Sequence, residues 1–130
     1  MKKLILGLVA LLALAAPSSK EAQAGAEAWL SLVDGEKYAD SWREAGSIFR
    51  SRVTQDKWVE AAKSVRSPLG PLTTRSLLNV NLSKSLPGLP DGDYAIVQFR
   101  SAFKNKADAV ETVSLCLEED KLRAIGYFIK

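Results

Sequence analysis

The sequence changes its hydrophobic period at one place, the Pro-Leu-Gly-Pro stretch at residues 68–71. Before this stretch, apolar side chains recur every three or four residues, which is the period of an amphipathic helix. After it, apolar and polar side chains alternate, which is the period of a half-buried strand. Because the later connections are short, the strands are expected to be antiparallel neighbours. The chain is therefore predicted to fold as an α+β domain, with helices first and a sheet afterwards.

Three helices are predicted before the Pro-Leu-Gly-Pro stretch. The first spans residues 25–34 and ends at Asp34-Gly35. The second spans residues 36–51 and carries an aromatic stripe, and the third begins after Thr54, a good capping residue. The apolar face of the first helix consists of Ala26, Trp29, Leu30 and Val33.

Four strands are predicted after it, and they form a meander with the helices packed on one face of a curved sheet. Their ranges are 74–83, 94–103, 110–118 and 122–129. Strict alternation in the first strand places Arg75, Leu77, Asn79 and Asn81 together on a solvated face.

The N-terminus has the pattern of a signal peptide. A basic start, Met1-Lys2-Lys3, precedes an apolar run from Leu4 to Ala16, which is too short to span a bilayer comfortably. Small-residue cleavage patterns end at Ala15 and at Ala24, and the second is favoured here. The prediction is a signal peptide over residues 1–24 and one domain over residues 25–130. The mature chain would then be periplasmic or secreted and would keep no stable membrane anchor.

Composition excludes several chemistries. The chain has no histidine and one cysteine, so Ser-His-Asp hydrolysis, histidine-bound zinc and an internal disulfide are excluded. No metal ligand set and no cofactor motif is found, so neither a metal nor a cofactor is expected. Removing residues 1–24 lowers the net charge from +3 to +1, so nucleic acid is not expected as a partner.

Five residues are candidates for ligand binding. Arg66 and Arg75 flank the Pro-Leu-Gly-Pro stretch, where two guanidinium groups would bind a carboxylate or phosphate. The structural alternative is that each arginine caps a helix or pairs with an acid of the first helix. Tyr38, Trp42 and Tyr94 would line a pocket for an apolar ligand, and the alternative is that they pack in the core.

Two further functions remain open. An acid/base enzyme without histidine would need a carboxylate of raised pKa beside a tyrosine, and the spacing selects no pair among the candidates. The candidate acids are Asp34, Asp40 and Glu111, and the candidate donors are Tyr38, Tyr94 and Tyr127. A homodimer through the outer sheet face is the other possibility. The role of Cys116 is left open, as a bystander or as one half of an intermolecular bridge.

Several runs resemble the bacterial family known as domain of unknown function 4019. The matching pieces are Trp29-Leu30, Val33-Asp34, Tyr38, Ser41-Trp42, Trp58, Val65 to Gly70, Arg75, Gly88 to Tyr94, Phe99, Phe103, Glu111-Thr112-Val113, Arg123 and Gly126-Tyr127-Phe128. Leu122 stands where a tryptophan is expected before Arg123. The resemblance implies a small exported bacterial protein with no established activity. Its helix-then-sheet order is similar to the nuclear transport factor 2-like cone.

These observations favour a non-catalytic binding or interaction module. It would bind a small molecule or a component of the cell envelope in a cleft between helices and sheet. No residue is assigned a catalytic role.

Overall fold

The structure, a computed structural model, describes residues 15–130 and has the predicted α+β class. The elements are α1 (Ser19–Asp34), α2 (Tyr38–Glu44), α3 (Ser47–Arg52), α4 (Gln55–Arg66), the 3₁₀ turn η2 (Ser67–Leu69), β1 (Leu72–Ser83), β2 (Tyr94–Phe103), β3 (Lys106–Glu118) and β4 (Lys121–Ile129). The described part of the chain thus has four α-helices, and the prediction of three is wrong. Most of the predicted signal peptide, residues 1–14, lies outside the described residues.

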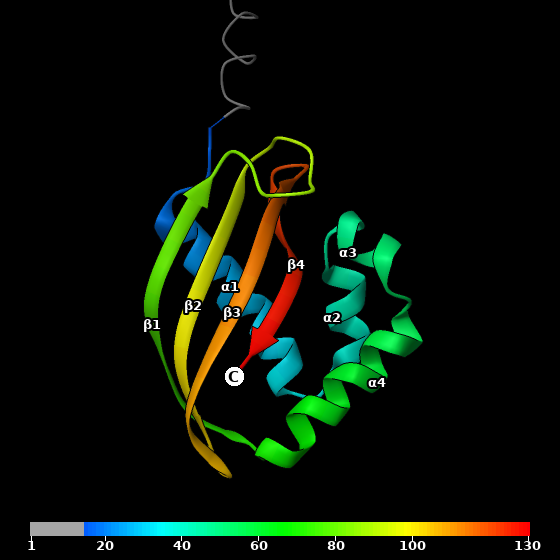
Figure 1. The fold of residues 1–130 in the computed structure, drawn as a ribbon, viewed down its shortest axis with the longest axis vertical. Coiled ribbons are helices and arrows are strands. Elements are labelled where there is room, and N and C mark those ends of the chain that lie inside the picture. The colour runs from blue at the N-terminus through cyan, green and yellow to red at the C-terminus, as the bar shows by residue number, and fades with distance from the viewer. Residues whose placement is uncertain (1–14) are drawn as a thin grey trace, which may run out of the picture.

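The four strands form one antiparallel sheet in the order β1–β2–β3–β4, which confirms the predicted meander. Helix α1 crosses one face of the curved sheet and contacts all four strands, whereas α2, α3 and α4 gather beside β4 (Figure 1). A two-residue turn joins β3 to β4, and its residues Glu119 and Asp120 have φ of 49° and 67°. Positive φ at both positions matches the right-handed twist of the strands. The similarity to the nuclear transport factor 2-like cone stays a prediction.

Helix α1 begins six residues before the predicted start at residue 25. The Ser18 hydroxyl accepts a hydrogen bond from the Glu21 backbone N–H at 3.0 Å, and the Glu21 carboxylate accepts one from the Ser18 N–H at 2.8 Å. This reciprocal pair is a capping box, which satisfies two donors that a helix start otherwise leaves unpaired. Ala22, in the second turn, is completely buried. The predicted start is wrong because the capping residues Ser18 and Glu21 lie within the predicted signal peptide, residues 1–24.

The predicted helix over residues 36–51 is divided into α2 and α3. At the division, Ala45 has an extended backbone and the Gly46 N–H donates to the Ala124 carbonyl of β4 at 2.7 Å. A Cβ atom on Gly46 would lie 2.8 Å from Cγ2 of Ile125. The chain leaves the helix here because its backbone pairs with the sheet edge at a distance that a side chain would prevent.

Replacing Gly46 with alanine is expected to destabilise the fold by about 1–3 kcal/mol, the usual cost of overpacking. The φ of Gly46 is −69°, which any residue adopts, so the effect is steric. Gly92→Ala is the matched control, because its added Cβ would lie no closer than 3.7 Å to Tyr94. Urea unfolding followed by circular dichroism measures both. Equal stability of the two variants would contradict the tight contact.

A bulge in β1 overturns the predicted alternation of that strand. Leu77 pairs with Phe99 and Asn79 pairs with Gln98, so Leu78 has no partner in β2. The extra residue reverses the two faces of the strand beyond it. Arg75 therefore faces the helices together with Val80, and Asn79 lies on the opposite face, where its amide bonds Gln98. A bulge cannot be read from alternation alone.

The indole groups of two helices meet at Ser41, which is completely buried. Nε1 of Trp29 donates to the Ser41 carbonyl at 2.9 Å, and Nε1 of Trp58 donates to its hydroxyl at 2.8 Å. The hydroxyl in turn donates to the Tyr38 carbonyl at 2.7 Å. The ring centroids of Trp29 and Trp58 are 5.9 Å apart. The tryptophans thus form a hydrogen-bonded core between α1, α2 and α4.

Candidate functional site

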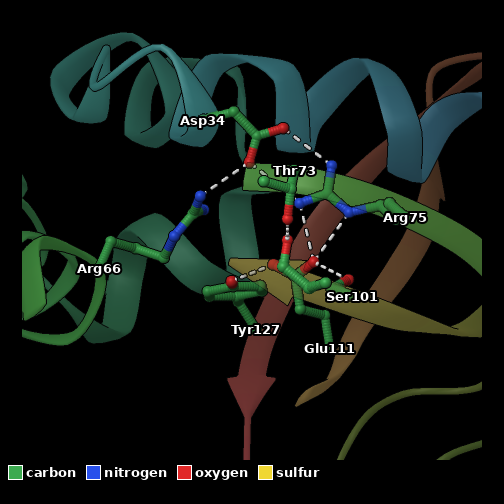
Figure 2. Close-up of polar contacts among 8 residues, drawn as sticks. Asp34, Arg66, Thr73, Arg75, Ser101, Glu111 and Tyr127 are labelled. Atoms are coloured by element: carbon green, nitrogen blue, oxygen red, sulfur yellow. Dashed lines mark hydrogen bonds and ion pairs between the residues drawn. The ribbon is translucent and has the colours of Figure 1, made fainter. Parts of the chain in front are cut away.

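A cluster of charged side chains lies where the helices meet the sheet (Figure 2). We call it the six-residue network: Asp34, Arg66, Arg75, Ser101, Glu111 and Tyr127. Each residue comes from a different element, in order α1, α4, β1, β2, β3 and β4. The network therefore joins two helices, α1 and α4, to every strand of the sheet.

Arg75 is the centre of this network. Its Nη1 donates to Oδ2 of Asp34 at 2.8 Å, and its Nη2 donates to Oδ1 at 2.9 Å. Its Nε donates to Oε1 of Glu111 at 2.8 Å. Glu111 has no exposed surface, and it also accepts from the Ser101 hydroxyl at 2.5 Å and from the Tyr127 hydroxyl. Such charge-assisted, partly bidentate bonds are the strong ones in proteins.

Arg66 binds the same carboxylate from the helical side. Its Nη2 donates to Oδ1 of Asp34 at 2.9 Å, and its guanidinium carbon lies 4.7 Å from the centre of the Phe103 ring. The side chain is 5% exposed, and its Nε and Nη1 have no hydrogen-bond partner within residues 15–130. Cation–π attraction to Phe103 offsets part of the cost of burying this charge.

The charges of the network cancel, because two guanidinium groups face two carboxylates. Burial raises the pKa of the Asp34 carboxyl, but the hydrogen bonds and charges of Arg75 and Arg66 outweigh it and hold that pKa below its ordinary value. A ligand carboxylate or phosphate would have to displace Asp34 to reach both arginines. The alternative that these arginines pair with an acid of the first helix is confirmed, with Asp34 as the acid.

Two network residues carried a signal that alternation alone could have detected. In β2, Ser101 lies between Phe99 and Phe103 on the apolar face. In β3, Glu111 precedes Val113 on the apolar face. A single polar residue in register with a buried face needs a polar partner. Ser101 is not among the predicted site residues, and Glu111 is predicted only as a candidate acid.

The structure does not gather the other predicted ligand-binding residues into one site. Tyr38 is buried at the start of α2, and the Trp42 indole donates to the Val53 carbonyl at 2.8 Å. Tyr94 starts β2, opposite Cys116 of β3, and its hydroxyl donates to the Pro90 carbonyl. Tyr94 also lines a small hollow of about 160 Å³. Arg66 and Arg75 meet at Asp34, away from this hollow, whose lining contains neither arginine.

Among the candidate acids and tyrosines, Glu111 and Tyr127 form a pair, although the spacing in the sequence selects none. Burial, followed by the charge of Glu111, raises the pKa of Tyr127 far above its ordinary value. The Glu111 carboxylate already binds Arg75, Ser101 and Tyr127, so its oxygens are occupied by protein donors. The pair therefore contributes to the network, and a substrate would have to replace one of these donors.

The tyrosines are expected to resist ionisation while the protein is folded. Burial raises the pKa values of Tyr38, Tyr94 and Tyr127, which are all the tyrosines of the chain. The neutral form is favoured in the fold, so stability is complete below about pH 10, the ordinary tyrosine pKa, and falls as the pH rises above it. Tyrosinate absorbance at 295 nm should appear together with loss of the circular dichroism signal. Reversible ionisation near pH 10 with an unchanged circular dichroism spectrum would contradict this.

A cleft of about 430 Å³ lies between α1 and the β3–β4 hairpin. We call it the α1–hairpin cleft. Its apolar lining includes Ala28, Trp29 and Leu32 of α1 with Leu117 and Leu122 of the hairpin. None of the five predicted ligand-binding residues lines it. Ala28 and Leu32 are one helical turn apart, on a stripe beside the core face, and this stripe was the signal available in the sequence.

The rim of the α1–hairpin cleft is mainly acidic. Glu21, Glu44 and Asp120 are part of its lining, together with one base, Lys121. Lys121 Nζ lies 3.1 Å from Oε1 of Glu44, so this pair is mutually neutralised. Glu21 and Asp120 remain as the excess charge. The cleft thus combines apolar walls with a negative rim.

Within residues 15–130, no helix is long and apolar enough to cross a membrane, and no group of three or more metal-binding side chains is found. No curated protein and no solved structure matches the chain. The sequence model of one family, described as "Protein of unknown function (DUF4019)", matches residues 25–127. Because this match covers most of the chain, the chain belongs to the DUF4019 family of proteins of unknown function.

Proposed function

We propose that this chain is an exported, non-catalytic binding protein whose α1–hairpin cleft holds a small apolar molecule with a positively charged group. The observation that supports this proposal is the cleft itself. Its volume of about 430 Å³ falls in the range of about 300–1,000 Å³ that is usual for small-molecule sites. Apolar walls would stabilise a hydrocarbon chain by about 0.8 kcal/mol for each buried methylene.

Charge supports a cationic rather than an anionic ligand. Glu21 and Asp120 leave the rim with excess negative charge, and the Lys121–Glu44 pair adds none. An anionic head group would be repelled by the same carboxylates. The signal-peptide pattern of residues 1–24 supports a location in the periplasm or outside the cell, where amphiphilic small molecules and envelope components are encountered.

The two other functions predicted from the sequence have less support. The acid/base site would depend on Glu111, whose carboxylate is buried and bonded to three side chains. The homodimer would depend on the outer sheet face, where Asn79, Gln98 and Thr112 form a polar row across three strands. Neither site offers an apolar cleft to a ligand.

Ala28→Trp is expected to fill the cleft and to weaken binding of a cationic amphiphile at least tenfold. Ala28 is exposed on α1, so the larger side chain enters the cleft without disturbing the core. The probe is dodecyltrimethylammonium below its critical micelle concentration, and isothermal calorimetry measures its binding. The matched control is Ala61→Trp, the same substitution at an exposed position of α4 outside the cleft.

Dodecyl sulfate, with the same chain and the opposite charge, tests the role of the rim. The proposal expects saturable binding of the cation, weaker binding of the anion and unchanged binding in Ala61→Trp. No saturable binding, equal binding of both detergents, or unaltered binding in Ala28→Trp would each overturn it.

A further inference from the structure

The two sequence patterns for removal of the leader lie in very different surroundings. Ala15 and Ala16 are exposed and belong to no helix or strand. The second pattern, Ala22 to Ala24, lies within α1, and Ala22 has no exposed surface. The two cuts would therefore leave mature chains that differ in how much of α1 they keep.

A cut after Ala24 would remove part of the folded domain. The lost segment contains the capping box of Ser18 and Glu21 and the buried methyl group of Ala22. Helix α1 would then begin at Gly25, a residue with no side chain to cap it. The remaining helix would still have to cover the sheet, since α1 contacts all four strands.

The same cut would also remove one wall of the α1–hairpin cleft. Ala16, Pro17 and Glu21 line that cleft, and all three lie before Gly25. A cut after Ala15 leaves these three in place and removes only Ala15 from the lining. Two independent features, the start of α1 and the wall of the cleft, therefore require the residues between the two patterns.

We propose that a signal peptidase hydrolyses the peptide bond between Ala15 and Ala16, and that the mature protein begins at Ala16. This inference rests on the export that forms part of the proposed function. Water is added across the bond, which leaves a carboxylate on Ala15 of the leader and an ammonium group on Ala16. Since Ala16 and Glu21 both line the α1–hairpin cleft, the new ammonium group lies at its acidic rim, where the carboxylates of Glu21 and Asp120 still outnumber it.

The test is to express the full chain in a Gram-negative host, to isolate the exported protein, and to determine its intact mass and N-terminal sequence. Ala16 is expected as the first residue. Ala15→Lys places a long charged side chain at the cut and should abolish formation of this product, so that the precursor accumulates. Ala24→Lys is the matched control, because Ala24 is exposed and does not line the cleft, and it should give the same first residue as the wild type.

Gly25 as the first residue of the wild-type product, or loss of processing in Ala24→Lys, would overturn the assignment while export itself stands. A chain that keeps residues 1–15 and remains inside the cell would contradict both the assignment and the proposed export. A chain that reaches the periplasm uncut would overturn the assignment alone.

Discussion

Arg75→Met is expected to lower the free energy of unfolding by about 3–5 kcal/mol, the cost of removing one partner from a buried ion pair. The reason is Glu111, which has no exposed surface and would lose the guanidinium that balances its charge. Asp34 would keep its ion pair with Arg66 and would remain partly exposed to water. A loss of this size is a large fraction of the stability of an ordinary domain, about 5–15 kcal/mol. Urea unfolding at pH 7 measures it.

Two further variants separate charge from packing. Arg100→Met breaks an exposed pair with Asp108 and should cost less than about 1 kcal/mol. The double variant Arg75→Met with Glu111→Gln removes both charges. Ser101 and Tyr127 donate to different oxygens of Glu111, so the single amide oxygen keeps one of these two hydrogen bonds and the amide NH2 faces the other hydroxyl. The double variant should be more stable than Arg75→Met alone. If it is not, the cost lies in lost packing rather than in the unpaired carboxylate.

Trp29→Ala is expected to destabilise the fold by about 3–5 kcal/mol, as is usual for a large buried aromatic residue. Trp29 is 5% exposed, and its ring lies 5.9 Å from that of Trp58 and 5.7 Å from that of Tyr127. The substitution would leave a cavity between α1, α4 and β4 and would leave the Ser41 carbonyl without its indole donor. Thermal unfolding followed by circular dichroism measures the effect.

The control for this prediction is Phe128→Ala. Phe128 is 60% exposed, so this substitution should change the free energy of unfolding by less than about 0.5 kcal/mol. Trp29→Phe keeps most of the ring volume and removes the indole N–H, so its effect should lie between the two. A fully stable Trp29→Ala protein would show that the tryptophan pair is not part of the core.

The sequence was sufficient for the class of the fold and for the order of the strands. Hydrophobic period reports which face of an element is buried, and short connections leave few topologies open. It was insufficient at Gly46, because that glycine pairs with Ala124, a residue far along the chain. It was also insufficient at Leu78, because a bulge depends on the partner strand as much as on its own residues.

The candidate sites, too, could be predicted only in part from the sequence. Arg66 and Arg75 were selected for their charge and do meet, but their partners Asp34 and Glu111 come from α1 and β3, and no local pattern pairs them. The sequence does not predict the α1–hairpin cleft, because a cleft forms where two neighbouring elements leave a space between them. A hydrophobic period predicts that one face of an element is packed against another element. It does not indicate where along that face the two elements separate.

The order of the sheet has a consequence for how the chain reaches this structure. Every strand pairs with its neighbour in sequence, so the sheet closes short loops with little loss of chain entropy. The contact of α1 with β4 joins segments separated by most of the domain, and contacts of this kind slow folding. We expect the hairpins to form early and α1 to dock last. A chain that crosses a membrane with its N-terminus first would therefore stay open until β4 has emerged, and the six-residue network, which needs Tyr127, would be completed at the end of that passage.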